Sequence, residues 1–505
     1  MKKYWKFIAA AMIAGTALFT SCGTTDDNGV ASPAVRIGTI TPGSTTATVA
    51  VTIEDATEFY YAVVEATASA PVTGEYRNDV AADATSVNLS GLTASTDYTF
   101  YAYAVNGDVI SAIVNSNFTT LAEGEEQPDD DFAEIAAGTT LAGNITENSV
   151  MTAGSSYKLS GGLHVKAGAT LKIEEGVTIE AVDDEAPDYI LIEQGAKIDA
   201  QGTASNPIVM TSERKGDGAW GGLHICGYAH TNAGSSAVSE IGNAPYGGDN
   251  DADNSGILRY IRLEYTGYAL DSEHEANGVS FYGVGNGTTV EYLQAYKGSD
   301  DGFEFFGGSV DVKYMLVTSC SDDSFDWTEG WNGRGQFLVA YQEAESTLSY
   351  DCDCLMECDN NGNNYAVTPV SHPVLANVTL VGNGSDSQGV RLRAGTQVEL
   401  YNAIITNKGQ CITVETDETA AALADGTSVL EYIAMSTELS SDVDSYTNAM
   451  FMEAEGNSTD YASSLTDNYY GTIDGGITLE DSFFTPAAYR GAISTDNNWA
   501  EGWTL

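Results

Sequence analysis

An acidic pattern recurs in the middle of the chain at an interval of 22 residues. Ser299-Asp300-Asp301 returns as Ser321-Asp322-Asp323, and the following Gly302-Phe303-Glu304-Phe305 falls over Ser324-Phe325-Asp326-Trp327. Near copies in succession are typical of a solenoid, in which each repeat is one coil. With looser insertions the same column extends over five coils and comprises Ser280, Glu304, Asp326, Glu357 and Arg391.

The column should face outward, because side chains alternate along a strand and the flanking positions are apolar. These flanking residues, which we expect in the core, are Val279, Phe303, Phe325, Met356 and Val390. Neighbouring coils lie about 4.8 Å apart, so stacked carboxylates at 304, 326 and 357 would repel one another strongly. A bound cation, a carboxyl held protonated, or pairing with Arg391 and other basic residues would compensate for this repulsion.

Paired aspartates beside the column favour the cation. Asp300-Asp301 and Asp322-Asp323 would place four more ligand oxygens there, and Ca²⁺ takes about six to eight oxygens. A second calcium candidate is Asp249-x-Asp251-x-Asp253, although Tyr260 stands where an EF-hand has its bidentate Glu. The alternative for both candidates is turn chemistry alone, because Asp and Asn tolerate left-handed backbone and cap their own amides.

The same column could also carry out catalysis. Carboxyls one coil apart lie near the spacing of retaining glycosidases, and carboxyls two coils apart near that of inverting ones, so Glu304, Asp326 and Glu357 offer either geometry. Arg391 could be the base or the clamp of a calcium-assisted lyase. Pectate lyases and polygalacturonases have acidic residues on such a sheet, but a shared fold is only an analogy. The five scattered histidines do not assemble into a Ser-His-Asp or Cys-His site.

The elements that must position these residues change character along the chain. Residues 34–120 contain short alternating strands separated by Gly, Asn and Pro, which predicts an antiparallel sandwich. Residues 121–133 form an acidic linker with almost no apolar content. From residue 134 to 505, short β runs recur with Gly, Asn and Asp every twenty-odd residues, which predicts a parallel β-helix. The expected fold class is therefore all-β.

Residues 1–22 have the pattern of a lipoprotein signal peptide. Lys2, Lys3 and Lys6 precede an apolar stretch that is too short to span a membrane, and Leu18-Phe19-Thr20-Ser21-Cys22 resembles a lipobox. We therefore expect lipidation at Cys22 and attachment to outer-membrane lipid. Six cysteines remain in the mature chain, and we expect them to be buried or disulfide-bonded rather than metal-bound.

The charge balance narrows the range of partners. The chain has 72 acidic and 20 basic residues, for a formal net charge of -52, so it should repel phosphate backbones and anionic lipid head groups. Nucleic acid is therefore excluded as a partner. Metal cations, basic partners and neutral glycans remain, together with the simpler reading that the acidity keeps an extracellular protein soluble.

Two resemblances extend these expectations. Leu92-Thr93-Ala94-Ser95-Thr96-Asp97-Tyr98 resembles the tyrosine corner of fibronectin type III domains and implies such a domain over residues 34–120. The strings Tyr-Gly-Gly-Asp (246–249), Asn-Ser-Gly (254–256), Asp-Asp-Gly-Phe-Glu-Phe-Phe-Gly-Gly (300–308) and Tyr-Arg-Gly-Ala (489–492) resemble uncharacterised surface lipoproteins of Bacteroidetes. This resemblance implies a right-handed parallel β-helix at the outer face of the outer membrane, but no reaction.

Taken together, the sequence favours a non-enzymatic cell-surface lipoprotein whose β-helix binds a glycan or another macromolecule, such as a surface protein, with structural calcium. The alternative is a polysaccharide lyase or glycoside hydrolase that uses Glu304, Asp326, Glu357 and Arg391. The same sequence features would also fit a third interpretation, a purely structural envelope protein. An open groove over the acidic column would favour the enzyme over the other two interpretations.

Overall fold

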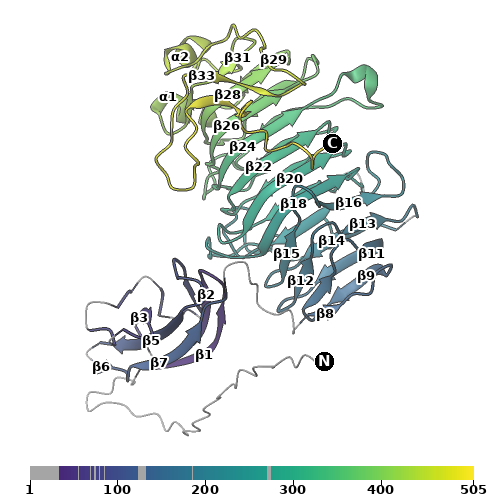
Figure 1. The fold of residues 1–505 in the computed structure, drawn as a ribbon. Helices are drawn as coiled ribbons and strands as arrows, with labels where there is room; N and C mark the ends of the chain where they lie inside the picture. Colours follow the sequence, from purple (N-terminus) through teal and green to yellow (C-terminus); the bar gives the residue numbers. More distant parts are fainter. Residues whose placement is uncertain are drawn as a thin grey trace. The chain divides into compact units, whose positions relative to one another are not determined.

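The computed structural model describes residues 33–54, 56–68, 70–72, 76–78, 80–82, 84, 86–107, 109–122, 132–184, 186–269 and 275–505. Cys22 and the predicted signal peptide lie outside these residues. The chain divides into two compact units, Met1–Asp130 and Asp131–Leu505 (Figure 1). No helix in the described part of the chain is both long enough and apolar enough to cross a membrane.

The first unit consists of antiparallel strands in two sheets. One sheet contains β1 (Ala34–Pro42), β2 (Ala47–Glu54) and β4 (Ser86–Leu89); the other contains β3 (Glu58–Glu65), β5 (Asp97–Asn106), β6 (Val109–Ile110) and β7 (Val114–Thr119). Alternate residues of both sheets meet in one apolar core around Phe59 and Phe100. The hydroxyl of Tyr98 accepts a hydrogen bond from the backbone N–H of Thr93 at 2.9 Å, which closes the turn before β5.

The second unit is a parallel β-helix, as the repeat predicts. Among its described strands, 25 form one continuous sheet in which the pairings between coils are parallel (Figure 1). The strands are β8 (Ala133–Glu134), β9 (Thr140–Ile145), β10 (Ser149–Met151), β11 (Ser156–Val165), β12 (Thr170–Ile173), β13 (Thr178–Ala181), β14 (Tyr189–Ile192), β15 (Lys197–Gln201), β16 (Ile208–Ser212), β17 (Leu223–Cys226), β18 (Gly256–Glu264), β19 (Val279–Tyr282), β20 (Thr289–Tyr296), β21 (Phe303–Phe306), β22 (Val312–Thr318), β23 (Phe325–Thr328), β24 (Arg334–Tyr341), β25 (Met356–Cys358), β26 (Val374–Val381), β27 (Gln388–Leu392), β28 (Glu399–Thr406), β29 (Gln410–Val414), β30 (Val429–Glu431), β31 (Ala434–Met435) and β32 (Ser440–Ser441).

From β17 to β28 each coil contributes one short and one long strand. The short strands β17, β19, β21, β23, β25, β27 and β29 pair in that order and form the site-bearing face. The long strands β18, β20, β22, β24, β26 and β28 pair in the same way. Side chains that point inward from both sets fill one continuous apolar core along the coils, so the outward-facing residues are left free for a surface site.

Each long strand bends at one residue in the left-handed region of the backbone, and these residues stack along the coils. They are Tyr260, Tyr292, Tyr314, Phe337, Asn377 and Asn402. The first three rings stack with centroids 4.3 and 4.4 Å apart, so one ring is in van der Waals contact with the next. Because non-Gly residues seldom adopt this backbone, other contacts must stabilise it. The stacked rings do so in the first coils, and the side-chain amides of Asn377 and Asn402 do so by donating to the carbonyl oxygens of Tyr489 and Ile477.

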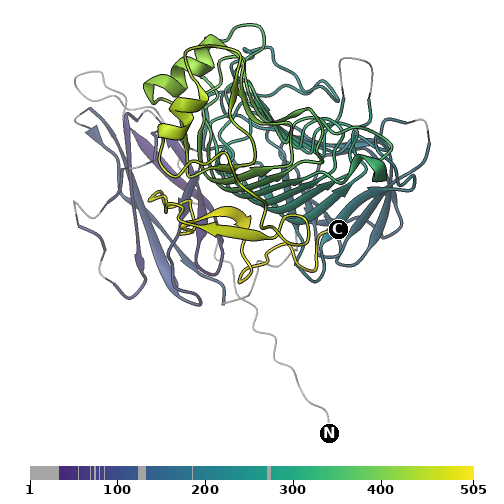
Figure 2. The same cartoon turned by 90° about the horizontal axis from the view of Figure 1, so that it is seen from above.

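The C-terminal segment folds back over these bends. It contains β33 (Gly471–Asp474) and β34 (Tyr489–Ile493) and lies beside the long strands (Figure 2, yellow). Trp499 and Trp503 pack edge-on against the stacked tyrosines. The helices α1 (Asp417–Asp425) and α2 (Asn448–Glu453) lie at the same end of the coil stack as β28 to β31 (Figure 1). The C-terminal segment therefore covers the face formed by the long strands, whereas the face formed by the short strands carries the open acidic surface described next.

Candidate functional site

Strand register confirms the predicted column. Ser280 pairs with Glu304, Glu304 with Asp326, Asp326 with Glu357, and Glu357 with Arg391 on the successive strands β19, β21, β23, β25 and β27. The predicted inward neighbours are all buried in the core: Val279, Phe303, Phe325, Met356 and Val390. The alternation of short strands thus places one polar side chain per coil on the outer face.

The four charged side chains of the column line an open groove of about 390 Å³, which we call the acidic groove. Arg391 is the one basic residue of its lining among the described residues. The other lining residues are carboxylic acids: Glu240, Glu275, Asp300, Asp301, Glu304, Asp322, Asp323, Asp326, Asp353 and Glu357. A groove lined this way concentrates negative potential at one place on an already acidic protein.

The paired aspartates at the turns form a relay of hydrogen bonds from coil to coil. The backbone N–H of Asp323 donates to Oδ1 of Asp301 at 2.9 Å, and the N–H of Cys354 donates to Oδ1 of Asp323 at 2.7 Å. Asp301 and Asp323 are only 6% and 5% exposed. Each therefore uses one carboxyl oxygen to hold the next turn and has a second oxygen for the groove.

Glu304 and Asp326 differ in their hydrogen-bond partners. The side-chain amide of Asn277 donates to Oε2 of Glu304 at 2.6 Å and to the hydroxyl of Ser280 at 3.0 Å. Oδ1 of Asp326 is buried and has no hydrogen-bond partner among the described residues. A donor to the charged form favours ionisation, whereas an unpartnered buried oxygen disfavours it.

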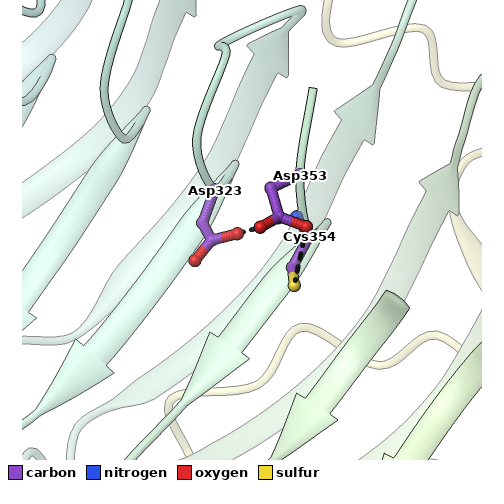
Figure 3. Close-up of side chains that lie close together, drawn as sticks. All are labelled: Asp323, Asp353 and Cys354. Carbon is purple, nitrogen blue, oxygen red and sulfur yellow. Dashed lines mark hydrogen bonds between the residues drawn. The ribbon is translucent and has the colours of Figure 1, made fainter. Parts of the chain in front are cut away.

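Four sets of three side chains in or beside this groove bring their ligand atoms within 4.8 Å of one another. Three sets contain only carboxylates: Asp300, Asp301 and Asp322; Asp301, Glu304 and Asp326; Asp323, Asp326 and Glu357. The fourth contains Asp323, Asp353 and Cys354, and Figure 3 shows the carboxyl groups of Asp323 and Asp353 pointing toward each other beside the Cys354 thiol. The three carboxylate sets offer hard oxygen ligands, which suit Ca²⁺ better than a soft metal.

Burial and mutual repulsion raise the pKa of these carboxyls. Burial, followed by the charges of Asp322, Glu275 and Glu240, raises the pKa of Asp300 to about 8. The pKa values of Asp301, Glu304, Asp323 and Asp326 lie well above the ordinary range, for burial first and neighbouring carboxylates second. At neutral pH the cluster must therefore share protons or hold a cation.

A pH dependence of stability follows from Asp300. Its folded-state pKa of about 8 lies above its unfolded value, so its contribution to the free energy of unfolding is complete below that unfolded value and is lost as the pH rises through about 8. In the presence of chelator, we expect the Tm to fall between about pH 5 and about pH 8. Thermal melts across this range test it. A Tm that stays flat or rises would contradict the raised pKa, and Asp300→Asn should reduce the slope.

Arg391 is held by two carboxylates at the end of the column. Its Nη1 donates to Glu357 at 2.8 Å and its Nε donates to Glu415 at 2.8 Å. The hydrogen bond to Glu415 is the main cause that raises the pKa of Arg391 above its already high ordinary value. An arginine in this state is a poor proton acceptor, so its position suits a clamp better than a base.

The second calcium candidate is not gathered into one set of ligands. Oδ1 of Asp251 accepts hydrogen bonds from the ring and the backbone N–H of His230 at 2.6 and 3.1 Å. Oδ2 of Asp253 accepts one from the backbone N–H of Tyr228 at 3.1 Å. Within the described ranges, no set of three neighbouring ligands contains Asp249, Asp251 or Asp253. The carboxylates of Asp251 and Asp253 instead hold the earlier segment that contains Tyr228 and His230.

The six described cysteines are buried with free thiols: Cys226, Cys320, Cys352, Cys354, Cys358 and Cys411. Burial raises the pKa of the Cys320 and Cys352 thiols to about 12. They are therefore uncharged at neutral pH and pack as small apolar side chains.

Three residues of the groove are missing from the sequence prediction. Asp353 could have been predicted, because it follows Asp322 by the same 31 residues that separate Asp326 from its neighbour Glu357 on the next coil. Glu240 and Glu275 come from segments outside the strands, and nothing in their spacing links them to the column. Only the folded chain brings them to Asp300.

Comparisons with known proteins concern the fold. A family model described as a pectate-lyase like beta helix domain matches residues 143–504. The Family 28 exopolygalacturonase of Yersinia enterocolitica is 10% identical, with a TM-score of 0.26 over 85% of this chain and 97% of that chain. The pectate lyase PelI of Erwinia chrysanthemi, solved with tetragalacturonic acid, is 8% identical, and Pel3 of Pectobacterium carotovorum is 7% identical; each has a TM-score of 0.16 over 73% of this chain and 89% of that chain. No curated protein matches this sequence.

Proposed function

The chain belongs to the family of pectate-lyase-like β-helix domains, and we propose that it cleaves the glycosidic bonds of a polysaccharide in the acidic groove. One observation carries the proposal. Asp301, Glu304 and Asp326 bring their carboxyl oxygens within 4.8 Å of one another on the wall of an open groove. Burial and crowding there favour a mixture of protonated and ionised carboxyls, which glycoside hydrolysis requires.

The two carboxyls in register have environments that suit different roles. Asp326, with an unpartnered buried oxygen, is the general acid that protonates the leaving oxygen. The hydrogen bond from Asn277 offsets part of the burial that raises the pKa of Glu304, so Glu304 is the partner that ionises and attacks the anomeric carbon. Their carboxyl oxygens lie within 4.8 Å of each other, near the roughly 5–5.5 Å between the carboxyl groups of retaining glycosidases, so retention of anomeric configuration is the expected outcome. Arg391 holds Glu357 in place beside them.

The second candidate function depends on calcium bound in the same groove. The carboxylates of Asp300, Asp301 and Asp322 and those of Asp323, Asp326 and Glu357 form two adjoining oxygen sets, and Ca²⁺ takes about six to eight oxygens. When bound, the ion would neutralise the cluster and, in a lyase, would attract an acidic sugar. A groove loaded with calcium rather than protons would then act as a lyase site or as a structural brace.

We also propose the cellular setting. Lipidation at Cys22 would attach the chain to outer-membrane lipid, with both units facing the cell exterior. The two-sheet unit is proposed as a fibronectin type III-like spacer, which the hydrogen bond from Thr93 to Tyr98 supports. In this setting the natural ligand is a polysaccharide or a surface protein reached from outside the cell.

A substrate panel tests the reaction. The purified protein is incubated with galactan, arabinan, xylan and polygalacturonate, with and without calcium, and new reducing ends and unsaturated products are measured. We expect reducing ends without unsaturation from a neutral polysaccharide, with retained configuration. Unsaturated products that form only with calcium would show that the protein is a lyase and not a hydrolase. Binding without any product would overturn both and restore the reading of a glycan-binding protein.

A further inference from the structure

A second pocket of about 290 Å³ lies at the far ends of the strands that carry Glu357 and Arg391. Asp359, Tyr365, Arg393 and Glu415 contribute to its walls. We call it the Tyr365 pocket. Asp359 follows β25, Arg393 follows β27 and Glu415 follows β29, so the pocket continues the site-bearing face beyond the acidic groove.

An ion-pair network joins the two cavities. Arg391, which lines the acidic groove, bonds Glu415 of the Tyr365 pocket at 2.8 Å. Arg393, which lines the Tyr365 pocket, lies 3.0 Å from Glu357 of the acidic groove and donates to Asp359 at 2.8 Å. The two cavities therefore lie next to each other, on either side of this ion-pair network.

The pocket presents an exposed aromatic residue on a fixed segment. Tyr365 is 40% exposed. The buried amide of Asn360 donates to the carbonyl oxygens of Tyr365 and Val367 at 3.0 Å, and its own oxygen accepts from the N–H of Ser371 at 3.0 Å. The Tyr365 carbonyl packs so closely that a Cβ on Gly395 would lie 2.1 Å from it. The backbone that carries the Tyr365 ring is thus held in place before any ligand arrives.

We propose that the Tyr365 pocket is a subsite for one neutral sugar unit of the polysaccharide whose scissile bond lies in the acidic groove; this rests on the proposed function. The volume is at the lower end for ligand pockets, which suits a single unit. Tyr365 supplies an apolar face for the sugar ring, and Arg393, Asp359 and Glu415 supply hydrogen-bonding groups for its hydroxyls. Two carboxylates against one guanidinium disfavour an acidic sugar.

The test measures binding apart from turnover. Cello-, manno-, xylo- and galacto-oligosaccharides, as disaccharides and hexasaccharides, are titrated calorimetrically against the Asp326→Asn chain, with hexagalacturonate as the charged comparison. We expect a neutral hexasaccharide to bind more tightly than its disaccharide and than hexagalacturonate. Adding Tyr365→Ala should weaken hexasaccharide binding about tenfold, whereas Tyr365→Phe should keep the parent affinity.

The outcomes separate the subsite from the reaction. Equal hexasaccharide affinity with and without the Tyr365 ring, or preference for hexagalacturonate, or no binding of any of these probes, would overturn the subsite. Absence of product from the wild-type chain on the polysaccharide panel would overturn the cleavage reaction, while binding that depends on Tyr365 would still support the pocket. Because Tyr365 is exposed, a Tm equal to that of the parent serves as the check on folding.

Discussion

Replacing Asp326 with Asn should lower kcat on the cleaved polysaccharide by about a thousandfold and leave the fold intact. Asn has the shape of Asp but cannot deliver a proton to the leaving oxygen. The buried Oδ1 of Asp326 has no hydrogen-bond partner among the described residues, and its pKa is raised by burial first and by neighbouring carboxylates second. Removal of this carboxyl therefore relieves repulsion rather than breaking a bond. Steady-state rates and the Tm of the two proteins test the prediction.

The matched control is Asp474→Asn, at an exposed position at the end of β33. It makes the same chemical change far from the column and should leave kcat and Tm unchanged. If Asp326→Asn retains turnover within about tenfold of wild type, Asp326 is not the general acid, since such a group typically contributes a hundredfold or more.

The double variant Asp301→Asn, Asp323→Asn should have opposite effects on the Tm in chelator and in calcium. Asn can still accept the backbone hydrogen bonds that Asp301 and Asp323 accept from Asp323 and Cys354, so the turns are kept while two buried ionisable groups are lost. In chelator at neutral pH the variant should melt at or above the wild-type temperature. In calcium it should melt below wild type, because calcium at about 100 times its Kd adds about 2.7 kcal/mol to a chain that binds it.

The control for this pair is Asp251→Asn with Asp253→Asn, the other candidate calcium segment. Its carboxylates already accept hydrogen bonds from His230 and Tyr228, so we expect its melting to respond to calcium as wild type does. Equal melting of wild type and the Asp301, Asp323 variant, with and without calcium, would eliminate calcium from the acidic groove. The cluster would then be neutralised by protons alone.

The column itself could be predicted because a solenoid converts sequence period into spatial contact. Residues 22 apart, such as Glu304 and Asp326, are neighbours once each coil occupies the same number of residues. Looser intervals still aligned Ser280, Glu357 and Arg391, because the apolar residues beside them must all enter one core. A shift by one residue would have turned those side chains to the wrong face.

The groove around the column could not be predicted in the same way. Glu240 and Glu275 lie in segments between strands, where no period constrains their length or direction. The hydrogen-bond partners of the carboxyls could not be predicted from the sequence either. They distinguish Glu304, which accepts a hydrogen bond from Asn277, from Asp326, whose Oδ1 has no partner among the described residues. The Tyr365 pocket depends on how Asn360 and Gly395 hold one loop against the next coil.

The sequence by itself determined the all-β class, the stacking of coils and the outward column of carboxylates, because these follow from local alternation and from a repeat that every coil obeys. Only the tertiary structure decided that the column lines an open groove, that its carboxyls are buried enough to raise their pKa values, and that Arg391 is held by Glu357 and Glu415. The physical reason is that burial and electrostatics at one point depend on loops from several coils, whose paths no period in the sequence specifies.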